Sequence, residues 1–313
     1  MRDLFKKNYR SDLALENIET YGMDNDENYI KNDYLDEENN ISVTNIKILD
    51  ENFGKEIGKS IGTYVTIESE ELSQNNNIHN KVIEYLGLEI KKILYDNKIK
   101  EEDEVLVVGL GNRNFTPDTI GIKSLDKILV TKHIYNDLDV VSRGKLRSVS
   151  ALGTGVMGQT GFETASIIKG VLKENKNISC VIAIDALSAR NINRVNSSIQ
   201  ISDTGIAPGS GVKNKRATLD ESYLGVKVIA IGVPTVISLE SIIYDSFEDF
   251  FGEEKIYENI EQFNRFLQDK KKMFVSVKNI DEIAIKLQNI IATGVNLGLH
   301  KNLTISEIND ILL

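Results

Sequence analysis

The sequence predicts an α/β protein with a mainly parallel, twisted sheet that is flanked by helices and carries additional peripheral elements. In the middle of the chain, strand-like apolar runs alternate with helix-like segments, a pattern that requires crossover connections between parallel strands. All three prolines and 14 of the 22 glycines lie between residues 109 and 234, so the loops with the most specific shapes belong to this region. The 313 residues are 41% hydrophobic and 27% charged, a composition typical of a globular protein with a sizeable core.

Each element follows from a local pattern. Runs rich in Val, Ile and Leu predict strands at residues 105–109, 127–131, 181–184 and 226–232. Helical spacing of apolar residues predicts helices at residues 162–172, 187–195 and 279–297. Alternation of polar and apolar residues predicts an edge strand at residues 62–68, and the acidic stretch 24–39 is expected to be a solvated surface loop.

Composition excludes several classes of protein. The formal net charge of −10 disfavours non-specific binding to DNA or to an anionic membrane. No apolar run reaches the roughly 20 residues that span a bilayer, and the first residues are too polar for a secretory signal. Cys180 is the only cysteine and lies in an apolar run, so it is expected to be a buried thiol rather than a nucleophile. A cytosolic location follows from these features.

Two aspartates follow two of the predicted strands. Asp118 comes after strand 105–109 and a Gly-Asn turn, and Asp185 follows strand 181–184 directly. The carboxyl ends of parallel strands form the crevice where ligands bind, and two carboxylates that meet there can act as one acid and one base. A carboxylate at a strand-to-helix junction can equally be a helix cap, so the local sequence leaves both roles open.

Other catalytic motifs are missing or incomplete. The Gly-x-Gly-x-x-Gly fingerprint fails at Asn114, and no Walker loop, His-Glu-x-x-His helix, paired-cysteine site or Gly-x-Ser-x-Gly elbow occurs. The three histidines, His79, His133 and His300, are far apart in the sequence. These absences favour chemistry by the two aspartates, with the backbone N–H groups of loop 153–161 as candidates for an oxyanion hole.

A second glycine-rich loop, residues 206–216, carries Lys213, Lys215 and Arg216. These cations could bind an acidic residue of a substrate, or the segment could be an ordinary solvated basic loop.

Six ordered motifs resemble the germination protease family of spore-forming Firmicutes. The match spans essentially residues 5–302. The motifs are Gly-Leu-Gly-Asn with Thr-Pro-Asp (109–118), Gly-Val-Met-Gly-Gln-Thr-Gly (155–161), Ile-Asp-Ala-Leu (184–187), Ile-Ser-Asp-Thr-Gly (201–205), Pro-Gly-Ser-Gly (208–211) and Ile-Gly-Val-Pro-Thr (231–235).

The resemblance implies a fold similar to the hydrogenase-maturation endopeptidases and an endopeptidase that starts the degradation of small acid-soluble DNA-binding spore proteins at germination. It implies a homotetramer in the cytoplasm of the forespore and spore core, with no cofactor and no direct contact with nucleic acid or membrane. The family's proposed catalytic aspartates correspond to Asp118 and Asp185.

The resemblance also implies a zymogen that processes itself near its N-terminus. The family cuts after an acidic residue and before an apolar one, which corresponds here to the bond between Asp12 and Leu13. Residues 1–12 would then be a propeptide and residues 13–313 a single α/β peptidase domain, with its core at about 60–240 and a helical part at about 241–313. The propeptide carries four basic and two acidic residues, so we hypothesise that it lies near the active crevice and inhibits it.

Two departures from the family pattern keep alternatives open. Positions 207 and 213 are Ala and Lys where the pattern has His and Gly, and residues 246–275 diverge. The hydrogenase-maturation relatives hold nickel through two acidic residues and a histidine, whereas no histidine occurs here between His133 and His300. The remaining alternatives are a metal-dependent peptidase that uses the same aspartates and a non-enzymatic module that binds peptides.

Overall fold

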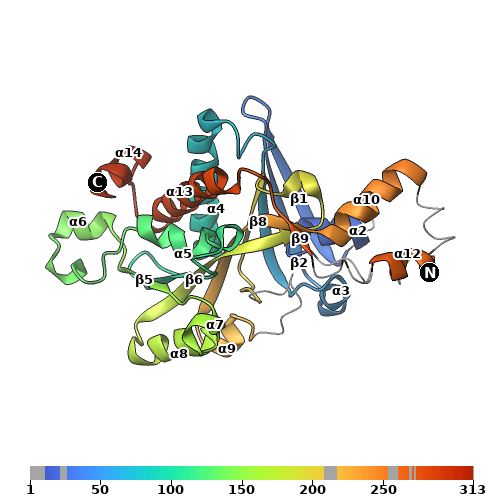
Figure 1. The fold of residues 1–313 in the computed structure, drawn as a ribbon. Helices are drawn as coiled ribbons and strands as arrows, with labels where there is room; N and C mark the ends of the chain where they lie inside the picture. Colours follow the sequence, from blue (N-terminus) through green and yellow to red (C-terminus); the bar gives the residue numbers. More distant parts are fainter. Residues whose placement is uncertain are drawn as a thin grey trace.

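The computed structural model describes residues 11–21, 27–207, 217–252, 260–267, 270 and 273–312. Within these residues, nine strands form one sheet with helices packed on its faces, which confirms the predicted α/β class (Figure 1). The sheet order is β1-β2-β3-β7-β8-β6-β4-β5, and β9 pairs with β8. The strands are β1 (Tyr29–Asp36), β2 (Ile41–Ile48), β3 (Gly62–Glu68), β4 (Glu104–Gly109), β5 (Val149–Gly153), β6 (Ile178–Ala189), β7 (Ser198–Ser202), β8 (Lys227–Ser238) and β9 (Phe274–Val275).

The sheet is mixed, so the expectation of a mainly parallel sheet is only partly right. Strands β5, β4, β6 and β8 are parallel neighbours, whereas β1, β2, β3, β7 and β9 pair antiparallel. A short turn between β1 and β2 allows only an antiparallel hairpin, because a parallel pair needs a long crossover. The parallel half nevertheless contains both strands that lead to the candidate aspartates.

Helices cover both faces of the sheet. In β4, Val105 and Val107 point to the core under α4 and α13, whereas Leu106 and Val108 point to the core under α8 and α9. Figure 1 shows α4 and α13 on one side of the sheet and α8 and α9 on the other. Burial on both faces explains why the parallel strands are continuous apolar runs.

The two longest described helices are α4 and α13. The helices are α2 (Ala14–Tyr21), α3 (Glu51–Ile57), α4 (His79–Asp96), α5 (Ile120–Ser124), α6 (Val140–Lys145), α7 (Met157–Thr160), α8 (Thr164–Glu174), α9 (Glu221–Leu224), α10 (Leu239–Phe251), α12 (Ile260–Leu267), α13 (Ile280–Leu299) and α14 (Ile305–Leu312). The predicted helices at 162–172 and 279–297 are confirmed as α8 and α13. Among the described helices, none is both long enough and apolar enough to cross a bilayer.

Two predicted elements are wrong in type. Residues 127–131 are not a strand, because the chain leaves a short 3-10 turn at Lys127 and its apolar side chains pack against the α13 side of the core. Residues 187–195 are not a helix, because β6 continues through Ala189 after a bulge at Leu187 and is followed by a 3-10 turn, Ile192–Arg194. Short apolar runs do not distinguish strand from buried loop or helix by periodicity alone.

Two further predictions are corrected by the structure, one about a surface loop and one about the position of a strand in the sheet. Within the acidic stretch, residues 29–36 form β1, an edge strand whose side chains are mostly exposed. Residues 62–68 form the predicted strand, but β3 lies between β2 and β7 and is not an edge. Cys180 is fully buried in β6, as expected.

Candidate active site

One cavity of about 490 Å³ lies beyond the carboxyl end of β4, against residues 185–188 of β6 and 230–236 of β8. Asp118 and Asp185 both line it, so the structure brings the two sequence-predicted aspartates to one site. Asp12 of the expected processing site lines the same cavity. The site therefore joins the loop after β4, the middle of β6 and the chain just before α2.

A tight turn after β4 positions Asp118. The N–H of Asn112 donates to the Asp118 carboxylate (2.9 Å) and to the Asp118 carbonyl oxygen (3.0 Å). Gly111 has φ +102°, and a Cβ at this position would lie 2.1 Å from the same carbonyl oxygen, so the turn requires glycine. The hydroxyl of Thr235 on β8 donates to the Pro117 carbonyl (2.6 Å) and fixes the turn to the sheet.

The second carboxylate lies within a strand. Asp185 is 6% exposed, pairs with Gly232 of β8, and accepts a hydrogen bond from the N–H of Ala186 (2.9 Å). Because β6 continues beyond it, Asp185 does not stand at a helix start, and the helix-cap alternative is wrong for this residue. The Asp118 carboxylate bonds Asn112, which precedes it, and Thr119 at the start of α5 makes no side-chain cap.

The chain around the expected processing bond lies along the end of β6. The N–H of Asp12 donates to the Ser188 carbonyl (3.1 Å), and the Ser188 N–H donates to the Asp12 carboxylate (2.9 Å). Leu13 is fully buried against Leu187 and Ala189. An acidic and an apolar side chain on either side of one peptide bond thus have separate binding places.

Two side chains hold the carbonyl of this bond. Lys59 Nζ donates to the Asp12 carbonyl oxygen at 2.6 Å, and Gln200 Nε2 donates to it at 3.0 Å. Gln200 Oε1 accepts the N–H of Ala14 (2.6 Å), so this amide contacts the backbone on both sides of the bond. Burial lowers the pKa of Lys59, while the charges of Asp12 and Glu16 oppose that shift.

Sequence reasoning missed Lys59 and Gln200. Lys59 lies in a flank without any motif, and its role depends on contact with a residue 47 positions away. Gln200 gives one usable signal: it is a polar residue at a buried position of a strand with Ile199 and Ile201 on either side.

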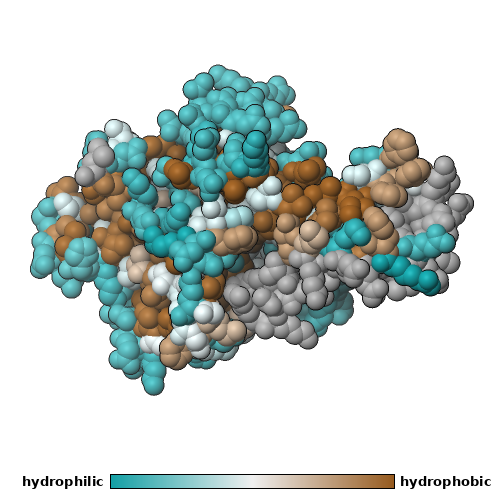
Figure 2. Space-filling view, in the orientation of Figure 1, coloured by the Kyte–Doolittle hydropathy of each residue, from teal (hydrophilic) through white to brown (hydrophobic). Residues whose placement is uncertain are grey.

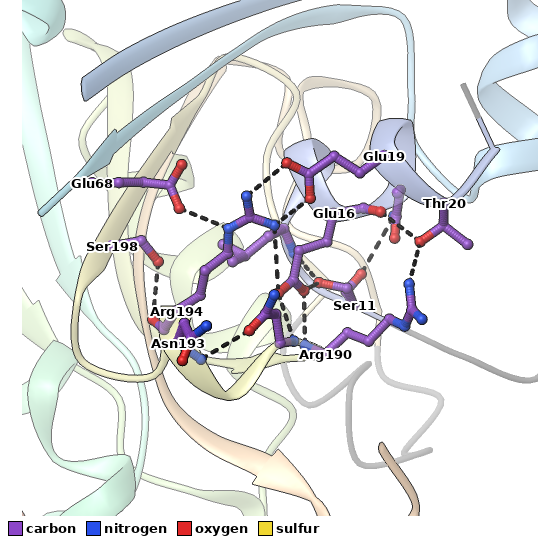
Figure 3. A network of polar contacts seen from close by, with 12 residues as sticks. Ser11, Glu16, Glu19, Thr20, Glu68, Arg190, Asn193, Arg194 and Ser198 are labelled. Carbon is purple, nitrogen blue, oxygen red and sulfur yellow. Dashed lines mark hydrogen bonds and ion pairs between the residues drawn. The ribbon is translucent and has the colours of Figure 1, made fainter. Parts of the chain in front are cut away.

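A polar network anchors α2 directly after the expected processing bond (Figure 3). Glu16 on α2 is buried and accepts from the N–H groups of Arg190 (2.7 Å) and Asn191 (2.8 Å). Arg194 bonds Glu19 on α2 through two guanidinium nitrogens and Glu68 on β3 through Nε (2.7 Å). Burial raises the pKa of Glu16, although its hydrogen bonds and the charge of Arg194 act in the opposite direction.

The structure describes one of the two loops predicted to assist catalysis, and only the first two residues of the other. In loop 153–161, the N–H groups of Gln159, Thr160 and Gly161 donate to carbonyls at Val156 and Met157, so these three are unsuitable as oxyanion donors. In loop 206–216, residues 208–216, with all three predicted cations, lie outside the described residues.

The described residues give little support for a metal site. Among them, no group of three or more His, Cys, Asp and Glu side chains could hold a metal ion. The described lining of the cavity includes none of the three histidines and has Ala207 where the family pattern has His.

Comparison with known proteins shows the family of the chain. The family model described as germination protease matches residues 11–262. The chain belongs to the germination protease family. A germination protease of Caldanaerobacter subterraneus subsp. tengcongensis is 38% identical over 97% of this chain and 98% of its own. Those of Clostridium perfringens (strain ATCC 13124) and Bacillus pumilus are 36% and 42% identical, covering 97% and 79% of this chain and 99% and 68% of their own.

Membership of the germination protease family makes the chain a protease and confirms the resemblance seen in the sequence. The matched region begins just before the Asp12–Leu13 bond and includes both candidate aspartates.

Proposed function

We propose that this germination protease is an endopeptidase that starts the degradation of small acid-soluble DNA-binding spore proteins, with Asp118 and Asp185 as its acid–base pair. The observation that carries the proposal is a single cavity lined by both carboxylates and by the acidic residue of a matching Asp-Leu sequence. The net charge of −10 supports protein substrates rather than direct contact with nucleic acid or an anionic membrane.

The reaction is hydrolysis by an activated water molecule. The ionised aspartate takes a proton from water as its oxygen attacks the scissile carbonyl carbon. The protonated aspartate then gives its proton to the leaving nitrogen, and the C–N bond breaks. General acid–base help from one positioned group accounts for about 10²–10⁴-fold in rate, so stabilisation of the developing oxyanion must supply much of the rest.

The same site processes its own chain in this proposal. Residues 1–12 are the propeptide, the cut falls between Asp12 and Leu13, and residues 13–313 remain as one peptidase domain, with its core at about 60–240 and its helical part at about 241–313. The position of Asp12 in the cavity and the burial of Leu13 support this bond. The basic propeptide and the acidic remainder favour an inhibitory position near the crevice.

We also propose that the protease forms a homotetramer in the forespore and spore core. Exposed aromatic side chains on α10, Phe247, Phe250 and Phe251, offer apolar surface for contacts between subunits. Figure 2 shows hydrophobic residues gathered on the visible face between α13 and α10. Analytical ultracentrifugation of the wild type and of Phe250→Ser tests this assembly.

The decisive experiment incubates the purified protease with a small acid-soluble spore protein and identifies the fragments by mass spectrometry. We expect cuts after acidic and before apolar residues, and complete loss of cutting in Asp118→Asn and in Asp185→Asn. Asp126→Asn is the matched control, because its carboxylate is exposed and pairs only at the surface with Arg113. Cleavage at the wild-type rate by either active-site variant refutes the acid–base pair.

Two further measurements separate the alternatives. Cleavage that survives exhaustive chelation removes the metal-dependent alternative. Absence of any cleavage, both by the wild type and by a chain that begins at Leu13, leaves only a peptide-binding module. A chain that begins at Leu13 should be more active than full-length protein that has not been processed. Equal activity of these two forms would show that residues 1–12 do not inhibit.

A further inference from the structure

We propose that Lys59 and Gln200 form the oxyanion-binding pair of this protease, and that the Ser188 N–H selects the acidic residue before the cut. This inference rests on the proposed function and assigns roles to residues beyond the aspartates. It makes Lys59 and Gln200 catalytic residues, because both contact the oxygen on which negative charge develops.

The first argument is convergence on one atom. Lys59 comes from the segment before β3 and Gln200 from β7, yet both donate to the carbonyl oxygen of Asp12, at 2.6 and 3.0 Å. Both donors contact the atom on which negative charge would develop during attack, and both residues line the cavity with Asp118 and Asp185. The two donors thus lie at the expected scissile bond itself.

The second argument is electrostatic. Lys59 is partly buried, and burial lowers its pKa, so its charge is poorly compensated by water. Negative charge that forms on the adjacent carbonyl oxygen during the attack of water would stabilise this cation strongly, because charges interact more strongly where water is scarce. Gln200 adds a neutral donor whose orientation is fixed by its second bond, to the N–H of Ala14 (2.6 Å).

With these roles, every electron pair and proton of the hydrolysis is accounted for. The C=O electron pair moves to the carbonyl oxygen as water attacks, and the oxyanion is held by Lys59 Nζ–H and Gln200 Nε2–H. The electron pair returns when the C–N bond breaks and the leaving nitrogen takes the proton of the protonated aspartate. Neither donor needs to lose its own proton.

The selection of substrate follows from the neighbouring contacts. The Ser188 N–H donates to the Asp12 carboxylate (2.9 Å). This charge-assisted hydrogen bond favours binding of an acidic side chain before the cut. Leu13 packs against Leu187 and Ala189, with Val195 and Ile206 beside them. This apolar pocket favours binding of an apolar residue after the cut. A spore protein bound in the same way would place its scissile carbonyl against Lys59 and Gln200.

A structural anchor for the N-terminal segment is the competing role, and the experiment separates the two. Full-length Lys59→Met, Lys59→Arg and Gln200→Glu are compared with Lys55→Met, an exposed lysine on α3 that pairs with Glu51. Three quantities are measured: the first-order rate of cutting at Asp12–Leu13 in the full-length variants, the kcat and KM for a spore protein in trans with the same substitutions in a chain that begins at Leu13, and hydrogen exchange of the amides of residues 13–15 in the full-length variants.

We expect Lys59→Met to slow both cleavages by about 10²–10³-fold, with KM changed less than threefold and the amides still protected. Gln200→Glu should slow cleavage at least as much, because it replaces the donor by a negative charge, while Lys59→Arg should restore part of the rate. Lys55→Met should behave as the wild type.

Cleavage by Lys59→Met within threefold of the wild-type rate would overturn the inference. So would a slow rate that appears only together with lost amide protection, since that result assigns Lys59 to anchoring. If Lys59→Met cleaves within threefold of the wild-type rate while Asp118→Asn and Asp185→Asn are inactive, only this inference fails and the proposed function stands. Normal cleavage by those two variants would instead refute the proposed function itself.

Discussion

Substitution of Gly111 by Ala tests whether the turn after β4 sets the position of Asp118. The new Cβ would lie 2.1 Å from the carbonyl oxygen of Asp118 and 3.0 Å from its Oδ1. The first of these atoms belongs to the backbone, so the clash cannot be relieved by rotation of a side chain. The turn must open, and the carboxylate must move with it.

The cost has two parts. Gly111 has φ +102°, and forcing a residue with a side chain into positive φ costs about 1–2 kcal/mol. Opening the turn weakens the two bonds from the Asn112 N–H, one of them to a carboxylate, for about 2 kcal/mol more. For 313 residues, this loss of about 3–4 kcal/mol corresponds to a fall in Tm of roughly 5 °C. A displacement of about 1 Å at a catalytic group costs on the order of 10²-fold in rate, which is the expected loss of cleavage.

Gly225→Ala is the matched control. Gly225 also has positive φ, +76°, but its Cβ would meet no atom within 4 Å. This variant should lose only the backbone term of about 1–2 kcal/mol and cleave normally. Urea unfolding and cleavage of a spore protein measure both effects. Full activity of Gly111→Ala, or equal loss of activity in Gly225→Ala, would refute this reasoning.

Three other predictions concern stability. Burial lowers the pKa of His300 from 6.5 to about 4, so the folded state gains stability above the unfolded pKa and loses it as pH falls toward about 4. Urea unfolding should give about 2 kcal/mol less stability at pH 5 than at pH 7, and His300→Asn should remove most of that difference. Arg194→Met leaves buried Glu16 without its nearby cation and should cost about 3–5 kcal/mol, and a double-mutant cycle with Glu16→Gln that shows no coupling would contradict this. Leu13→Ala should cost about 2–5 kcal/mol, because the side chain is fully buried, and an unchanged urea midpoint would argue against its packing role.

The parallel half of the fold could be predicted because its residues carry their own signal. Strands β4, β6 and β8 are buried on both faces and are therefore mostly apolar, most continuously before Asp185 in β6. Strand β1 could not be found in this way, because an edge strand with exposed side chains can be acidic and still form backbone hydrogen bonds. The extension of β6 past Leu187 depends on its pairing with β8, which no local pattern reveals.

The same contrast applies to the site. The shared cavity of Asp118 and Asp185 could be predicted because each follows an apolar run of a parallel strand, although β6 continues beyond Asp185 to Ala189. The proposed role of Lys59 and Gln200 could not be predicted, because it rests on contacts with the Asp12 carbonyl across 47 and 188 positions of sequence. Such contacts appear only when the antiparallel half of the sheet brings β3 and β7 beside the parallel half.

The two aspartates differ in the stiffness of their supports. Asp185 belongs to a strand of 12 residues that is bonded to β8 through Ala189, so its backbone cannot shift without breaking the centre of the sheet. Asp118 stands on a short turn that is held by a few bonds from Asn112 and Thr235. Any adjustment of the gap between the carboxylates must therefore come from the Asp118 side. If the proposed mechanism holds, a change in its working geometry would act through one small turn while the sheet remains a fixed frame.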